Sequence, residues 1–134
     1  MSFWAVFLAT VMMPLMILTW DVGRLFYARG ELQKAADAAA LAAVREVDVV
    51  HYMETKEIIL STSAPAYARG YALVNSDYLT QRGITPIVTD IVVDNTRKTV
   101  LVRLQADLSA LFPEFIHLPP TSVWGEAQVR LQTD

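Results

Sequence analysis

The chain has 134 residues, of which 54% are hydrophobic, a formal net charge of −3 and no cysteine. This length allows one domain core in addition to an apolar segment. The mild acidity, with no run of lysines and arginines, excludes the electrostatic footprint of a nucleic-acid-binding protein. Without cysteine, the chain has neither a disulfide framework nor a thiolate metal site.

The first twenty residues, MSFWAVFLATVMMPLMILTW, carry no charge, and their only polar side chains are Ser2, Thr10 and Thr19. A helix of about 20 apolar residues is long enough to span a bilayer. Trp4 and Trp20 lie near its two ends, where aromatic residues mark membrane interfaces. The remaining chain is too short to bury this helix on every side in a globular core. We therefore expect a membrane-spanning helix.

The charges around this segment leave its orientation open. Arg24 and Arg29 follow it and nothing basic precedes it. The positive-inside rule alone would then place the rest of the chain in the cytoplasm. A chain that begins at the edge of its hydrophobic segment is, however, also expected when a basic leader has been removed, and we expect such processing here.

Helix-favouring residues continue beyond the apolar segment as far as Val47. We expect residues 1–47 to form one long helix of roughly 70 Å, more than twice the thickness of the hydrocarbon core of a bilayer. Pro14 predicts a kink or a local unwinding near residues 10–14. Residues 35–43 are nearly all alanine, and such small side chains favour close packing against other helices.

One face of this long helix is expected to contact neighbouring subunits. Alternating steps of three and four residues follow that face, and Asp21 is the only acid on it. An acid at the membrane edge is costly unless it is paired, so we expect Arg24 or a neighbouring chain to be its partner. The predicted subunit-interface residues are Phe3, Phe7, Val11, Pro14, Leu18, Asp21, Arg24, Leu25, Leu32, Ala35, Ala39 and Ala42.

Residues 48–134 are expected to form a small α+β head, which begins with a helix end and linker up to residue 60. A second helix is predicted in STSAPAYARGYALVNSDYL, with caps at Ser61 to Ser63 and Pro65 in the first turn. Four large side chains at helical spacing are expected to face the long helix or the sheet. They are Tyr67, Tyr71, Val74 and Tyr78.

After Gly83 the hydrophobic period changes to two, which predicts strands. Residues 87–94 and 100–106 form a predicted hairpin around a turn at Asn95 and Thr96. Residues 123–132 form a third strand with one apolar and one polar face, so we expect helices to cover one side of the sheet. In the first strand, one face is expected to carry Ile87, Thr89, Ile91 and Val93. A short helical turn is expected from Leu108, Leu111, Phe112 and Phe115.

Residues with catalytic or metal-binding potential are scattered. His51 and His117 are far apart in the sequence, and no metal-ligand spacing, phosphate-binding loop or nucleophile elbow is present. Asp90 and Asp94 fall on the same face of one predicted strand, where a solvated strand face explains them better than an acid–base pair. We therefore expect no catalytic residue, no metal, no cofactor and no enzymatic activity.

The N-terminal sequence FWAVFLATVMMPLMILTWDVGRLFYARGELQKAADAAALAA resembles TadE- and TadG-like proteins of the tight-adherence (Tad) pilus system, a branch of the type IV pilus machinery. The matching features are Pro14 within the apolar stretch, the DVGR motif at residues 21–24, the pair Leu32 and Gln33, and AADAAALA at residues 35–42. The resemblance is strong over residues 3–43 and looser in the head. Pilins usually carry a glutamate near the start of the mature helix, and residues 2–7 contain none.

The resemblance implies a pilin-like structural subunit. Such a chain would be held in the inner membrane by its helix and then packed with other copies into an extracellular type IV or Tad-like filament. Its partners would be copies of itself and the pilus assembly machinery, and its final location the cell surface. The alternative is a minor pilin or a membrane-anchored assembly component that primes or caps a filament of another subunit. A third class, a membrane-tethered enzyme or receptor, would require a pocket with converging polar groups.

Overall fold

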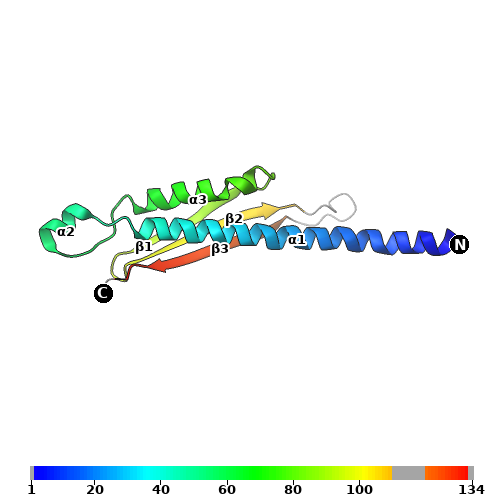
Figure 1. The fold of residues 1–134 in the computed structure, drawn as a ribbon, viewed down its shortest axis with the longest axis horizontal. Coiled ribbons are helices and arrows are strands. Elements are labelled where there is room, and N and C mark those ends of the chain that lie inside the picture. The colour runs from blue at the N-terminus through cyan, green and yellow to red at the C-terminus, as the bar shows by residue number, and fades with distance from the viewer. Residues whose placement is uncertain (1, 110–119, 133–134) are drawn as a thin grey trace.

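The structure is a computed structural model that describes residues 2–109 and 120–132 (Figure 1). Within these residues, three strands form one antiparallel sheet in the order β1-β2-β3. This arrangement confirms the α+β fold, with a long N-terminal helix followed by a small head. The elements in chain order are α1 (Ser2–Val44), α2 (Val49–Thr55), α3 (Ala64–Thr80), β1 (Pro86–Asp94), β2 (Thr99–Leu108) and β3 (Thr121–Arg130).

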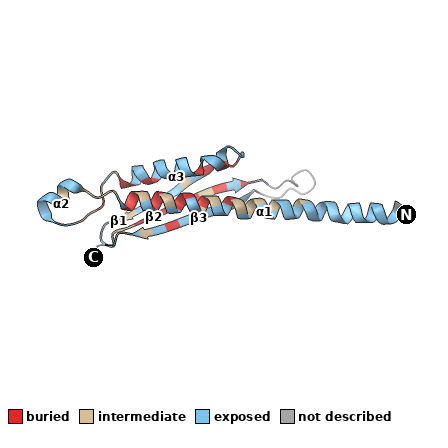
Figure 2. Ribbon diagram, in the orientation of Figure 1, coloured by how far each residue is buried: buried red, intermediate tan, exposed pale blue. Residues whose placement is uncertain are grey.

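Helix α1 is the longest element and projects from the head (Figure 1). It is helical without interruption through Pro14, so the local unwinding expected there does not occur. It ends at Val44, slightly earlier than the predicted end near residue 47. Its C-terminal half lies against the sheet and α3, whereas its N-terminal half extends beyond them (Figure 2).

The predicted hairpin is confirmed, and the last residue of β1 fixes its turn. The Asp94 carboxylate accepts hydrogen bonds from the backbone N–H groups of Thr96 and Arg97 at 2.9 and 3.0 Å. The predicted alternation of β1 is wrong in its first half, because the register shifts between Val88 and Asp90. This β-bulge exchanges the two faces, so that Ile87 is exposed.

One face of the sheet forms the core with α1 and α3. The inward side chains alternate along β2 and β3 with outward ones that are mostly polar, as the sequence predicts for a sheet covered on one side, although Leu101 and Trp124 are also outward. The inward side chains of β2 and β3 that are buried are Val100, Val102, Leu104, Ala106, Leu108, Val123 and Ala127. On the other face, Arg103 bridges the strands through ion pairs to Glu126 and, at 3.6 Å, to Asp90.

Gly125 sets how closely α1 approaches β3. A Cβ atom at this position would collide with the backbone of Leu32 and Gln33. The Gln33 side-chain amide donates to the Glu126 carbonyl at 2.7 Å and accepts from the Glu126 N–H at 3.3 Å. The helix therefore rests directly on the backbone of the strand.

Helix α3 packs on the core with its small side chains. Its buried residues are Ala64, Ala68, Ala72, Ser76 and Leu79. The four large side chains that were expected to face the long helix or the sheet are exposed, which contradicts that prediction for Tyr67, Tyr71 and Val74. The physical reason is steric, since alanines on α3 meet alanines on α1 and allow a close approach that tyrosines would prevent. Tyr78 does meet the long helix, because its ring packs edge-to-face against Tyr27 of α1 with the ring centroids 6.3 Å apart. The exposed residues are Tyr67, Tyr71, Val74 and Tyr78.

The predicted linker before α3 contains the short helix α2, which has no buried residue. Its base is closed by a bridge between Val47 and Leu60 and by a hydrogen bond from the Asp48 N–H to the Ile59 carbonyl at 3.0 Å. Of the short helical turn predicted after the hairpin, Leu108 was placed wrongly, because it is the buried last residue of β2. The rest of that turn, at Leu111, Phe112 and Phe115, lies outside the described residues.

Candidate assembly surface

The N-terminal half of α1 presents large apolar side chains to its surroundings. From residue 3 to residue 20 nearly every side chain is exposed, with Phe3 at 77% and Met16 at 69%. This is a helix long and apolar enough to cross a membrane, with a mean hydropathy of 1.9 over its best window. Exposed apolar area of this size is typical of a surface that lipid or another protein covers.

The polar side chains within this half satisfy their own hydrogen bonds. The hydroxyl groups of Thr10 and Thr19 donate to the carbonyl oxygens of Val6 and Leu15, both at 2.8 Å. Such bonding to the preceding turn removes the cost of placing a hydroxyl in an apolar environment. The two threonines are therefore compatible with a membrane or with a dry helix bundle.

The predicted subunit-interface residues divide into three groups along α1. The first group is exposed and comprises Phe3, Phe7, Val11, Pro14 and Leu18. The second is partly buried and comprises Asp21, Arg24, Leu25 and Ala42. The third is buried and comprises Leu32, Ala35 and Ala39. Because the chain's own sheet and α3 cover the third group, these three residues are not available to a neighbouring subunit while the head is folded.

Asp21 lies where α1 enters the head. Its carboxylate is 3.9 Å from the Arg24 guanidinium, and the two side chains are 16% and 32% exposed. This is one of the partners expected from the sequence. Leu108 and Thr121 from the sheet line the same small cavity as Asp21 and Arg24. The pair thus separates the exposed apolar half of the helix from the half that belongs to the core.

The exposed face of α3 adds a second apolar surface that the sequence analysis assigned to the core. A shallow groove of about 560 Å³ runs along it, lined by Ala66, Tyr67, Gly70, Tyr71 and Val74. The signal that could have found it is the second stripe of the same helix, where small residues recur at every fourth position from Ala64. Helix α3 thus carries two stripes with helical spacing, one of large and one of small side chains, and the stripe of small side chains faces the core.

Comparison with known proteins links α1 to pilus assembly. The model of the family described as "Putative Flp pilus-assembly TadE/G-like" matches residues 1–46. Over this segment, about a third of its length, the chain is similar to TadE/G-like pilus-assembly proteins. No significant match was found among curated proteins or among solved structures. The TadE/G-like segment includes both halves of α1, the exposed apolar one and the alanine-rich one that the head covers.

The polar residues with catalytic or metal-binding potential are placed apart from one another. His51 is on α2, with its Nε2 atom 3.9 Å from the Glu57 carboxylate, and His117 is not among the described residues. Asp90 pairs with Arg103 across the sheet, and Asp94 caps the hairpin turn. Residues 2–109 and 120–132 contain no group of three His, Asp or Glu side chains that could hold a metal ion.

Proposed function

We propose that this chain is a non-enzymatic, pilin-like structural subunit that packs through its N-terminal helix into an extracellular filament. Before assembly the same helix would hold it in the inner membrane. The observation that carries the proposal is the exposed apolar half of α1 within a segment that matches the TadE/G-like family. A surface of this kind is suited both to lipid and to the sides of identical helices, which provide equivalent apolar contacts.

The proposed filament core consists of residues 3–27 rather than the whole helix. The alanine-rich half supports this limit, because it is covered by α3 and the sheet. Leu25 and Tyr27 are partly buried and pack against the edge of the core. In this arrangement the heads surround a bundle of apolar half-helices, and Asp21 with Arg24 marks the boundary between bundle and head.

A second candidate function is a minor pilin or membrane-anchored assembly component that primes or caps a filament of another subunit. It is favoured by the description of the matching family, which names pilus assembly. The extent of the head along α1 also favours it, because much of the helix is then unavailable for repeated contacts with other copies.

The two candidates differ in copy number. Electron microscopy of producing cells and of the purified chain should show thin helical filaments made of this protein if it is the major subunit. Its amount in sheared surface material, measured against the other proteins there, should then be dominant. A low but constant ratio to another filament protein would support the minor component. A chain that stays monomeric and membrane-retained, without any effect of its deletion on filaments, would contradict both.

Asp21 provides a test at residue level. Replacing Asp21 with Ala leaves Arg24 without its carboxylate partner at the mouth of the head, so we expect several-fold less filament in sheared material. Asp37 is exposed on the same helix and offers the matched control, Asp37→Ala. Wild-type filament yield from Asp21→Ala would refute the role of this residue.

A further inference from the structure

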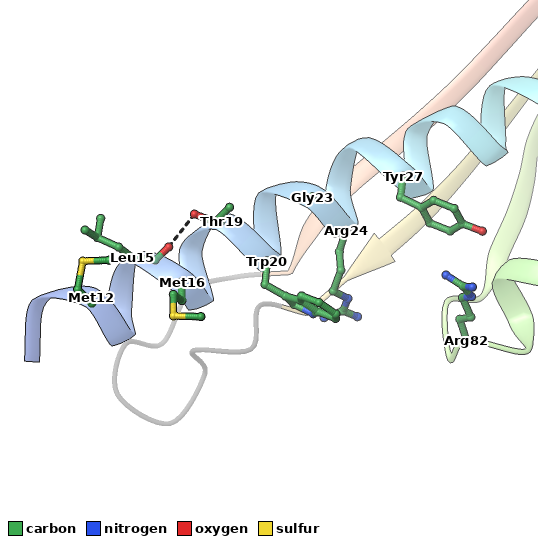
Figure 3. A pocket seen from close by; sticks show the side chains of 9 residues that line it. All are labelled: Met12, Leu15, Met16, Thr19, Trp20, Gly23, Arg24, Tyr27 and Arg82. Carbon is green, nitrogen blue, oxygen red and sulfur yellow. Dashed lines mark hydrogen bonds between the residues drawn. The ribbon is translucent and has the colours of Figure 1, made fainter. Parts of the chain in front are cut away.

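A cavity of about 550 Å³ lies between α1 and the segment that follows α3 (Figure 3). Most of its lining comes from one face of α1, and Arg82 reaches it from the turn that follows α3. It is open on one side and adjoins the apolar half of the helix. The lining residues are Met12, Leu15, Met16, Thr19, Trp20, Gly23, Arg24, Tyr27 and Arg82.

The two ends of this cavity differ in chemistry. Met12, Leu15 and Met16 form an apolar end within the predicted membrane span, as the sticks in Figure 3 show. At the other end are the guanidinium groups of Arg24 and Arg82, with aromatic rings beside them. The cavity is therefore amphipathic along the helix axis.

Arg82 is held in place without a carboxylate partner among residues 2–109 and 120–132. Its guanidinium lies over the rings of Tyr27 and Tyr78, at 4.9 and 4.5 Å from their centroids, and donates to the Tyr78 hydroxyl. These contacts orient the guanidinium but leave its positive charge unneutralised. Its remaining N–H groups are donors suited to a phosphate.

Other charges near the cavity leave its polar end positive. The negative charge of the Asp21 carboxylate partly offsets the positive charge of Arg24. The two groups are 3.9 Å apart, which is longer than a direct charged hydrogen bond. Glu31, further along α1, is engaged by Lys34 at 2.7 Å. With two arginines, one aspartate and one internally paired Glu–Lys couple, the polar end carries a net positive charge.

We propose that this cavity binds one anionic phospholipid, with its phosphate between Arg24 and Arg82 and an acyl chain along Met12, Leu15 and Met16. The inference rests on the membrane-inserted state of the proposed function. In that state Trp20 lies at the bilayer interface, which places the two guanidinium groups at the depth of the headgroups. The charge of the polar end and the apolar end below it match the two parts of such a lipid.

The test uses Trp20 as a reporter in the full chain. With Trp4→Phe and Trp124→Phe, the only remaining tryptophan lines the cavity. The chain is reconstituted into phosphatidylcholine vesicles that contain the same small fraction of either brominated phosphatidylglycerol or brominated phosphatidylcholine. We expect Trp20 fluorescence to be quenched more strongly by the brominated phosphatidylglycerol. Equal quenching by the two lipids would overturn the proposal.

Substitutions of arginine assign the preference to the cavity. Arg82→Gln should lower the preference for phosphatidylglycerol about five-fold, because one cation near a membrane surface contributes about 1 kcal/mol. Arg82→Lys should retain more of it than Arg82→Gln, since the charge is kept. The matched control is Arg69→Gln, because Arg69 is an exposed arginine on α3 that does not line the cavity. An unchanged preference in Arg82→Gln, or an equal loss in Arg69→Gln, would contradict the assignment.

Three further outcomes distinguish other occupants and the state of the chain. Loss of the lipid preference on addition of inorganic phosphate at millimolar concentration would show that the cavity is a site for free phosphate, and would overturn the proposal of a lipid site. Protection of Trp20 from both brominated lipids at high protein density, lost on dilution with lipid, would show that a second copy fills the cavity and would also overturn it. A chain that does not float with vesicles of either composition would refute the membrane-inserted state, whereas floating with equal quenching would refute only the lipid site.

Discussion

The N-terminal and C-terminal halves of α1 differ in side-chain size and in what covers them. Residues 3–20 carry Phe, Trp, Leu and Met side chains that are mostly exposed, whereas the alanines from Ala35 to Ala43 lie largely within the core of the head. Both halves are apolar, so hydrophobicity alone does not separate them. Size does, because small side chains let α3 and the sheet approach the helix backbone. Large side chains around the whole circumference suit a surrounding lipid phase or a bundle of helices.

Among substitutions that test the packing of the covered half of α1, Gly125→Ala is expected to have the largest effect on stability. The new Cβ would collide with the backbone of Leu32 and Gln33, and neither helix nor strand backbone can move aside easily. We expect the free energy of unfolding of the head to fall by about 3 kcal/mol, the upper part of the usual range for overpacking. Urea denaturation of the full chain in detergent, followed by circular dichroism, measures this change.

Gly30→Ala is the matched control for Gly125→Ala. Gly30 lies on α1, and a Cβ atom added there would meet nothing within 4 Å, so alanine should stabilise the helix by about 0.5–1 kcal/mol. If both substitutions left stability unchanged, the close contact between α1 and β3 would be disproved.

A smaller effect on stability is expected when the same substitution is made in each half of α1. Ala39→Leu inserts a large side chain into the covered half and should cost about 2 kcal/mol of stability. Ala9→Leu places the same side chain on the exposed half and should leave the stability of the head unchanged. The same denaturation experiment applies to both. Equal costs in the two variants would mean that the halves do not differ in packing.

Gln33→Ala addresses the hydrogen bonds that join the covered half to the sheet. It removes the amide that bonds both backbone groups of Glu126, so we expect a loss of about 1–2 kcal/mol in unfolding free energy. Gln128 is exposed on β3, the strand that contains Glu126, and Gln128→Ala should lower the unfolding free energy by less. A greater loss in the control would show that the Gln33 bonds contribute little.

The smallest effect concerns pH at the solvent face of the sheet. Hydrogen bonds from Ser122 at 2.6 Å and from Gln105 at 3.3 Å lower the pKa of Asp107 below its usual value. Because the folded-state pKa is lowered, the stabilisation is present above the unfolded-state pKa and is lost as pH falls through the folded-state value. NMR titration should show the Asp107 pKa rising in Ser122→Ala, and an unchanged pKa would contradict the role of this hydroxyl.

Much of the fold follows from local pattern. The long helix, the second helix, the hairpin and the third strand each have a clear period, and the structure contains all of them. The bulge at residues 88–90 was missed because both faces of β1 carry Ile or Val, so a shift of one residue leaves no mark in the hydrophobic pattern. The contact at Gly125 had a signal, since a glycine within an alternating strand marks a close backbone approach.

The candidate site was only partly predictable. Phe7 and Leu18 are exposed on α1, where an interface residue must be, but Leu32 and Ala39 are covered by the chain itself. A helical period shows that a face packs against something, and it does not show whether the partner is the same chain or another. The outward position of Tyr71 was missed for a related reason, because the choice between two faces of α3 depends on how near α1 comes.

The side chain of Gln33 also has a consequence for how heads can meet. In the order β1-β2-β3, strand β3 is at an edge of the sheet, where free backbone groups invite a strand from another chain. Both backbone groups of Glu126 are already bonded to Gln33. A neighbouring strand would have to displace this amide before it could extend the sheet. Contacts between heads at this edge are thereby directed to side chains, and continuous β-sheet growth from one subunit to the next is opposed.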